Sequence, residues 1–375
     1  MKSGPPEVLL SARDPATAHA VCVLLQHAQT DARLRFSVLA QSPALEILQR
    51  AELAVRLIPF PSRADTDQLV TAARTVLEQL GPEMILSGVS GPDCGVDEAL
   101  LAAGCERGIP CYALQSFWGD VNDTLGSVAE TFFVLDQQAA RLTRQRHPVR
   151  TVPVGSLKHA NYAAFDIAGI RQRQRAKLEL KPEQPLIGFF GQPLGQLPGY
   201  LETLQHLAPS LAAIPCSARV LYRPHPKETI TERDRSLTIL RQSGLKVLLD
   251  SEARVEHTLC ACDLVTSAFS SCGLDALYLN ALSPHPLNSV LYLLFNPELR
   301  SWYQHYTRLE ELPPVTAGMA LSCTKPDELA STLQHALQPE TRQQCWEQSR
   351  QLSPPQQAAQ KIIETLMADY SACKR

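Results

Sequence analysis

Residues 223–227 read Arg-Pro-His-Pro-Lys, a histidine between two prolines and two cations. Proline fixes the backbone on both sides of His225, so the imidazole would be held rigidly where a predicted strand ends. An imidazole or its cation can donate to a phosphate oxygen, and Arg223 adds positive charge. The segment therefore predicts an anion site. The alternative is that His225 caps a turn and that Arg223 lies on the surface.

A second polar cluster follows the apolar run at 264–267. Ser270, Ser271 and Gly273 surround the start of a predicted helix, where backbone N–H groups carry partial positive charge and can cradle a phosphate. Asp275 falls in the first helical turn. There it either accepts hydrogen bonds from ribose hydroxyls or complements the helix dipole.

A third loop follows the predicted strand at 186–190 and contains Gly191 and Gln192. A glycine at this place would let the backbone approach a ligand closely. The loop has the spacing of neither the dinucleotide fingerprint nor a P-loop. We therefore predict that it contributes to the anion site only together with the other two segments.

Candidate bases lie at strand ends in the first half of the chain. In our order of preference they are Asp14, His19 and Asp93, with Asp97 and Glu98 as further acids. A base must come within hydrogen-bonding reach of the proton that it removes, which residue type alone does not decide. The alternatives are helix N-caps for Asp14 and Asp93, a helix-face position for His19, and first-turn acids for the other two.

The composition bounds the class of protein. The 375 residues are 45% hydrophobic and 19% charged with a formal net charge of −3, which excludes a disordered or fibrous chain. A nucleic-acid partner is not expected, since such proteins carry a basic excess or stripe. The amino terminus has no apolar signal region and no stretch reaches about 18 consecutive apolar residues, so we expect a cytoplasmic protein without a transmembrane segment.

The eleven cysteines are spread over the whole chain, several of them in apolar stretches where a thiol acts as a small buried hydrophobe. Disulfides are therefore not expected. Cys260 and Cys262 lack the spacing and the second ligand pair of a zinc site. We predict neither a metal nor a cofactor.

Short apolar runs alternate with longer amphipathic stretches, which is typical of a parallel sheet covered by helices. Gly and Pro residues mark the ends of these elements. Strands are predicted at 8–12, 34–40, 55–59, 84–89, 111–115, 131–135, 149–154, 186–190, 218–223, 246–250, 264–267, 288–295 and 319–323. Helices are predicted at 16–29, 65–80, 96–107, 156–180, 199–211, 229–242 and 255–261, and from about 271 onward.

The rhythm breaks at the Pro-rich segment Lys-Pro-Glu-Gln-Pro, residues 181–185. We predict two Rossmann-like domains, at 1–165 and 186–338, with a linker at 166–185 and C-terminal helices at 339–375. Two such α/β domains would face each other across a cleft, and ligands bind at the carboxyl ends of parallel strands.

The order of these elements resembles the GT-B superfamily over nearly the whole chain. The arrangement is most similar to the UDP-N-acetylglucosamine 2-epimerase branch, and residues 223–226 and 270–275 look like the His-Pro and Ser-Ser elements of capsule and teichoic-acid transferases. The segments that carry the epimerase-like arrangement are 84–88, 108–110, 132–135, 152–155 and 315–318.

The resemblance implies a nucleotide-sugar donor bound mainly by the second domain, with the acceptor on the first. In the transferase families, the histidine and serine contact the nucleotide phosphates and an acid like Asp275 can hold the ribose. The epimerases have Gly-Asp-Thr where this chain has Gly-Val-Ser at 88–90, and His-Val-Glu-Ala-Gly where it has Ala-Leu-Gln-Ser-Phe at 113–117. The acids expected for epimerisation are therefore missing.

These observations favour a metal-independent glycosyltransferase that moves a sugar from a nucleotide-sugar donor to an unidentified acceptor. One alternative is a nucleotide-sugar epimerase or hydrolase. Another is a catalytically silent scaffold that binds nucleotides but has lost its base.

Overall fold

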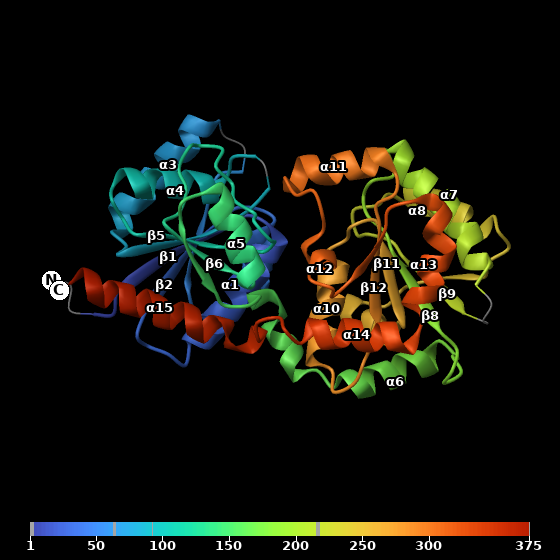
Figure 1. Cartoon of the computed structure of the whole chain (residues 1–375). Helices are drawn as coiled ribbons and strands as arrows, with labels where there is room; N and C mark the ends of the chain where they lie inside the picture. Colours follow the sequence, from blue (N-terminus) through green and yellow to red (C-terminus); the bar gives the residue numbers. More distant parts are fainter. Residues whose placement is uncertain (1–3, 63–64, 92, 215–217, 375) are drawn as a thin grey trace. The chain divides into compact units, whose positions relative to one another are not determined.

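The computed structural model describes residues 4–62, 65–91, 93–214 and 218–374 (Figure 1). The chain forms two compact units. The first unit comprises Met1–Ala163 and Ser353–Arg375, and the second comprises Ala164–Leu352. Each unit contains one sheet of parallel strands, which confirms the predicted α/β class.

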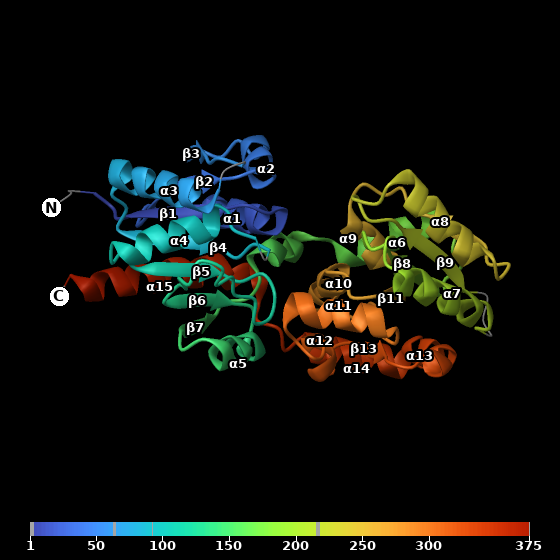
Figure 2. The same ribbon diagram turned by 90° about the horizontal axis from the view of Figure 1, so that it is seen from above.

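The first unit is built on a seven-stranded sheet with the order β3-β2-β1-β4-β5-β6-β7, and the strands can be followed in this order from top to bottom in Figure 2. All pairs in the sheet are parallel. The strands are β1 (Glu7–Ala12), β2 (Arg35–Ala40), β3 (Arg56–Pro59), β4 (Met84–Gly88), β5 (Cys111–Leu114), β6 (Thr131–Val134) and β7 (Arg150–Pro153).

Helices cover both faces of this sheet. Alternate residues of β1 point to opposite sides, so that Val8 and Leu10 join a buried cluster with α1, α2 and α15. On the other face α4 packs closely, since a Cβ added at Gly104 would lie 2.3 Å from Ile85 Cδ1. The helices are α1 (Pro15–Ala28), α2 (Ala44–Arg50), α3 (Thr66–Leu80), α4 (Val96–Glu106), α5 (Gln137–Arg146), η1 (Leu157–Ala164) and α15 (Ala358–Cys373).

The second unit repeats the design with a six-stranded parallel sheet of order β10-β9-β8-β11-β12-β13. Its strands are β8 (Leu186–Phe190), β9 (Arg219–Arg223), β10 (Val247–Leu249), β11 (Leu264–Ser267), β12 (Ser289–Leu293) and β13 (Leu321–Cys323). Its helices are α6 (Ile167–Lys177), α7 (Pro198–Ala212), α8 (Ile230–Arg241), α9 (Val255–Ala261), α10 (Cys272–Leu282), α11 (Pro297–Thr307), α12 (Pro313–Thr316), η2 (Pro326–Glu328), α13 (Leu329–Ala336) and α14 (Pro339–Ser349). The short η3 (Pro355–Gln357) belongs to the first unit.

Two segments differ from the predicted domain plan. The predicted linker at 166–185 contains α6, which belongs to the second unit because Arg171 and Arg175 bind Asp263 at the start of β11. The predicted C-terminal segment is divided, since α14 stays in the second unit and α15 returns to the first, where its apolar residues Ile362 and Leu366 are fully buried.

The order of the strands reverses once in each sheet, between β1 and β4 in the first and between β8 and β11 in the second. At such a switch point the loops leave neighbouring strands in opposite directions and open a crevice at the carboxyl ends. The loops at these two places therefore carry the candidate site residues of each unit.

Candidate functional site

Three predicted segments of the second unit converge at its switch point. Strands β9, β8 and β11 are neighbours, so the loops that follow them leave the same edge of the sheet. The backbone N–H of Gly191 donates to the carbonyl oxygen of Arg223 at 2.8 Å, and the N–H of Phe269 donates to Oε1 of Gln192 at 2.9 Å. Gln192 thus links the loop after β8 to the loop before the Ser270–Ser271 turn.

His225 is held as a neutral imidazole. Its Nδ1 accepts a hydrogen bond from the backbone N–H of Lys227 at 3.1 Å, so the ring proton is carried on Nε2. Burial, and secondarily the charge of Lys227, lower the pKa of His225 from its ordinary value. The half-buried side chain therefore offers one N–H donor over a wide pH range.

Glu228, which was not among the predicted site residues, fixes the loop that carries His225. Its Oε2 accepts hydrogen bonds from the Tyr222 hydroxyl at 2.7 Å and from the backbone N–H of His225 at 3.2 Å. A Cβ added at Gly191 would lie 2.6 Å from Oε1, so the glycine is required for this carboxylate to fit. Desolvation raises the pKa of Glu228. The position of Glu228 close to His225 is visible in the sequence, whereas its hydrogen bond with Tyr222 is not.

Ser270 and Ser271 have different roles at the start of α10. Ser270 is 6% exposed, and its hydroxyl accepts from the backbone N–H of Cys272 at 3.3 Å, which shapes the turn. Ser271 is the exposed N-cap residue, and its side chain makes no cap hydrogen bond. The hydroxyl of Ser271 and the positive end of the helix dipole are consequently presented at the same place.

Gly273 and Asp275 lie on the inner side of α10. A Cβ at Gly273 would lie 2.2 Å from the hydroxyl oxygen of Tyr292, so this glycine allows the helix to pack on β12. Asp275 is 4% exposed, and its charge contributes to raising the pKa of Tyr292, of which burial is the main cause. Packing on β12 accounts for Gly273, and the predicted ribose contact of Asp275 stays a prediction.

Arg223 is engaged in an ion pair. Its Nη1 donates to Oδ2 of Asp250 at 2.5 Å and to the carbonyl oxygen of Glu252 at 2.8 Å. These contacts join β9 to the segment after β10. The Asp250 carboxylate offsets the positive charge of Arg223, which was predicted to bind the phosphate. Arg223 is therefore the weakest of the predicted donor-site residues.

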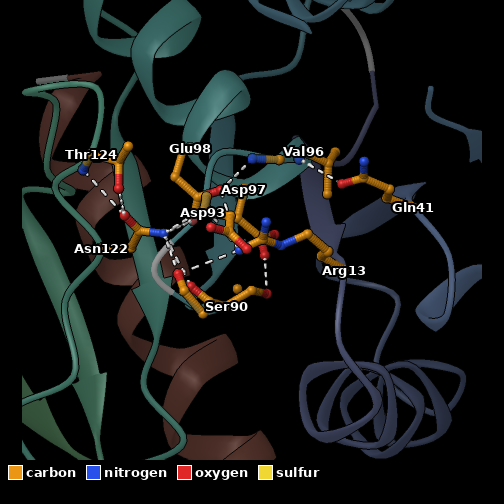
Figure 3. A network of polar contacts seen from close by, with 12 residues as sticks. Arg13, Gln41, Ser90, Asp93, Val96, Asp97, Glu98, Asn122 and Thr124 are labelled. Atoms are coloured by element: carbon orange, nitrogen blue, oxygen red, sulfur yellow. Dashed lines mark hydrogen bonds and ion pairs between the residues drawn. The ribbon is translucent and has the colours of Figure 1, made fainter. Parts of the chain in front are cut away.

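In the first unit the polar residues gather at the switch point between β1 and β4, as Figure 3 shows. Nδ2 of Asn122 donates to the carbonyl oxygens of Gly91 at 2.6 Å and Asp93 at 3.2 Å, and Nη2 of Arg13 donates to the same Asp93 oxygen at 3.0 Å. The end of the β4 loop is thus held from two sides. This arrangement positions Asp93, which is exposed.

Asp97 and Glu98 are buried beneath this loop. The hydroxyls of Ser11 and Ser90 donate to the two oxygens of Asp97, which is 0% exposed. Glu98 accepts from the N–H of Gly95, the N-cap residue of α4, at 2.8 Å and from Nδ2 of Asn122 at 2.6 Å. Both acids therefore support the loop rather than reach a substrate.

Asp14 and His19 occupy the positions of the alternative interpretation, which were a helix N-cap for Asp14 and a helix face for His19. Oδ1 of Asp14 accepts from the backbone N–H of Thr17 at 2.7 Å and caps α1. His19 lies on the exposed side of the same helix. Burial is the main cause that raises the pKa of Asp97, and the charge of Asp14 adds to it, so Asp14 lies close to the acids beneath the Asp93 loop.

The buried acids Asp97 and Glu98 predict that the free energy of unfolding falls as pH rises, which is the opposite of the usual dependence for carboxylates. Desolvation and the charge of Asp97 raise the pKa of Glu98 from 4.5 to about 7, so the folded state holds more protons than the unfolded state between these values. The free energy of unfolding should fall as pH rises through that window, by on the order of 2 kcal/mol for the coupled pair. Denaturant unfolding of Glu98→Gln at pH 5 and pH 8 should show a smaller fall than the parent protein.

Glu106→Gln is the matched control, since Glu106 is an exposed residue of the same helix whose pKa is lowered by its hydrogen bond to Arg74. It should leave the fall between pH 5 and pH 8 in place. An equal fall in the parent protein and in Glu98→Gln would contradict the assignment of this window to Glu98.

Among the described residues, no three His, Cys, Asp or Glu side chains come together as a metal-binding group. No helix within the described ranges is long and apolar enough to cross a membrane.

Comparisons with known proteins support the fold. No protein-family model matches the chain, and no curated protein matches it by sequence. Its structure is similar to S. aureus MnaA solved with UDP, at a TM-score of 0.66 and 14% identity over 98% of this chain and 97% of the other.

Two more solved structures have a similar fold. A UDP-GlcNAc 2-epimerase from Neisseria meningitidis bound to UDP-GlcNAc has a TM-score of 0.66 and 14% identity over 96% of this chain and 100% of the other. MurG of Acinetobacter baumannii has a TM-score of 0.64 and 13% identity over 96% and 99%. The chain therefore has a GT-B-like fold, and the predicted resemblance to this superfamily is confirmed at the level of the fold.

Proposed function

We propose that this protein is a glycosyltransferase that uses a nucleotide-sugar donor, with the donor held by the second unit. The observation that carries the proposal is the convergence of three loops at one switch point. They bring Gly191, Gln192, His225 and the Ser270–Ser271 helix start to one edge of the sheet. The similarity to structures solved with UDP and UDP-GlcNAc makes a uridine diphosphate sugar the first donor to test.

The chemistry follows from the charge that develops when the nucleotide leaves. Cleavage of the bond between the sugar and the phosphate places negative charge on a phosphate oxygen. The Nε2–H of His225 and the N-terminus of α10, with the Ser271 hydroxyl, would donate to that oxygen and stabilise the transition state. This arrangement requires no divalent metal.

Two positions in the first unit favour transfer over epimerisation. The chain has Val89 within the segment where the epimerases carry Gly-Asp-Thr, and this residue is 5% exposed at the end of β4. Gln115 lies in the segment where they carry a glutamate, and its amide donates to the carbonyl oxygen of Asp120 at 2.8 Å and to the Thr143 hydroxyl at 2.9 Å. Neither segment supplies a carboxylate that could exchange a proton with the sugar.

The acceptor hydroxyl needs a base, and we assign this role to Asp93. Its carboxylate is exposed on a loop held by Arg13 and Asn122. Asp14 already caps a helix, and His19 is exposed on that helix. A carboxylate at a switch point can remove the proton as the acceptor oxygen attacks the sugar.

The test compares donor turnover with and without an acceptor. UDP-GlcNAc and a panel of other nucleotide sugars are incubated with the protein, in water alone and with alkyl glycosides that offer free hydroxyls. Transfer predicts release of nucleotide that rises with the acceptor and a new glycoside. Equal release of nucleotide and free sugar in water alone would establish a hydrolase, and a change of sugar configuration with the nucleotide still attached would establish an epimerase.

A further inference from the structure

A cavity opens into the first unit at the edge of its sheet opposite the candidate site. Its volume is about 350 Å³, and it lies where α1 ends and where β2 and β3 begin. Arg35 and Arg56 are the first residues of these two strands, whereas the loops around Asp93 leave the carboxyl ends of β1 and β4. The cavity is therefore separate from the network described above.

The cavity is lined mainly by apolar side chains. Leu25 of α1 and Leu34, which directly precedes β2, are each 5% exposed. Phe36 and Val55 are half-buried and pack against the same core cluster. An apolar group that enters the cavity is thereby removed from water, which is favourable.

The chain between α2 and β3 forms one wall of the cavity. Glu52 has a φ of +48°, which is uncommon for a residue other than glycine, and its N–H donates to the carbonyl oxygen of Gln49 at 3.3 Å. The N–H of Val55 donates to the carbonyl oxygen of Leu53 at 2.8 Å. These local hydrogen bonds fix the wall, so the cavity is formed before a ligand binds.

Two arginines give the cavity a positive charge. Arg35 is partly neutralised, because its Nη2 lies 3.6 Å from Oε2 of Glu7 and its Nε donates to the carbonyl oxygen of Pro5 at 3.2 Å. The Arg56 guanidinium forms no ion pair or side-chain hydrogen bond with another residue of the described ranges. Among the described residues that line the cavity, none is acidic. A guanidinium beside an apolar wall suits a carboxylate, sulfonate or phosphate that is attached to an apolar group.

We propose that this cavity binds a small amphiphilic anion, with the apolar group of the ligand against Leu25, Leu34 and Phe36 and its anionic group on Arg56. Small-molecule pockets have volumes of about 300–1,000 Å³, so this cavity fits a short alkyl chain or a single ring rather than a whole membrane lipid. The bound ligand would connect α1 with the edge strand β3. Its binding should therefore stabilise the first unit.

The test measures the binding of octanoate to the full chain by titration calorimetry, beside octylammonium and acetate. Octylammonium has an equally long chain with the opposite charge, and acetate has the same charge without the chain. We expect octanoate to bind about tenfold or more tightly than either of them. Arg56→Gln should weaken octanoate binding by about tenfold, because it removes a charge-assisted hydrogen bond. Ala28→Leu places a larger side chain in the cavity and should weaken binding at least as much.

Arg50→Gln is the matched control, since Arg50 is an exposed arginine at the end of α2 and lies outside the lining of the cavity. It should bind octanoate like the parent protein. Arg56 is also exposed, so both arginine variants should keep the parent circular dichroism spectrum.

Equal affinity for octanoate and octylammonium would overturn the proposal, as would octanoate binding that neither Arg56→Gln nor Ala28→Leu changes. Sedimentation of the protein with phosphatidylglycerol vesicles, without binding of octanoate, would also overturn it, because the ligand would then be a membrane lipid.

Discussion

His225→Ala is expected to lower kcat of sugar transfer by about 10²-fold or more, the usual effect of removing one donor to a developing oxyanion. The variant loses the Nε2–H that the contact between Lys227 and Nδ1 holds in place. Because this donor acts on charge that appears as the nucleotide leaves, KM for the donor should change less than kcat. Steady-state kinetics with the donor found by the panel measures both.

His206→Ala is the matched control, since His206 is an exposed histidine of α7 in the same unit. It should keep nearly full activity. A His225→Ala enzyme with unchanged kcat would remove His225 from the mechanism.

Asp263→Ala should have the largest effect on stability. This carboxylate is 6% exposed and binds Arg171 at 2.6 Å, Arg175 at 2.8 Å and Arg342 at 2.8 Å. Removing one partner of a buried ion pair costs about 3–5 kcal/mol, because the other charges stay buried without compensation. Urea unfolding followed by circular dichroism should show this loss in the transition of the second unit.

The control is Asp234→Ala, which removes an exposed carboxylate that lies 2.9 Å from Arg233. Exposed pairs contribute about 1 kcal/mol or less, so this variant should unfold nearly like the parent protein. If both variants lost equal stability, the cluster around Asp263 would not be the structural link between α6, α14 and β11 that its contacts suggest.

The strands could be predicted from the sequence because their signals are local. The predicted 264–267 and 186–190 match β11 and β8, and the seven predicted strands of the first half fall within one residue of β1 to β7 at either end. Buried parallel strands are continuous apolar runs bounded by turn residues, which a short window of sequence can reveal. The short α2 and the polar α5 gave no such signal.

The site was predicted where local chemistry defines it and missed where distant residues meet. His225 and Ser271 stand out because proline and helix-start chemistry mark them. The hydrogen bond from Ser11 to Asp97 joins residues 86 apart in sequence, and Arg342 reaches Asp263 across 79. Such contacts depend on the order of strands in the sheet, which single-sequence patterns do not encode.

Calorimetric titration with UDP, GDP, CDP and CMP tests the central claim most directly, namely that the loops after β8, β9 and β11 form one anion site. We predict that one of these nucleotides binds the parent protein, and that His225→Ala and Ser271→Ala each weaken its binding by about tenfold, or 1.4 kcal/mol. Absence of binding by all four, or affinity untouched by both substitutions, would contradict the claim.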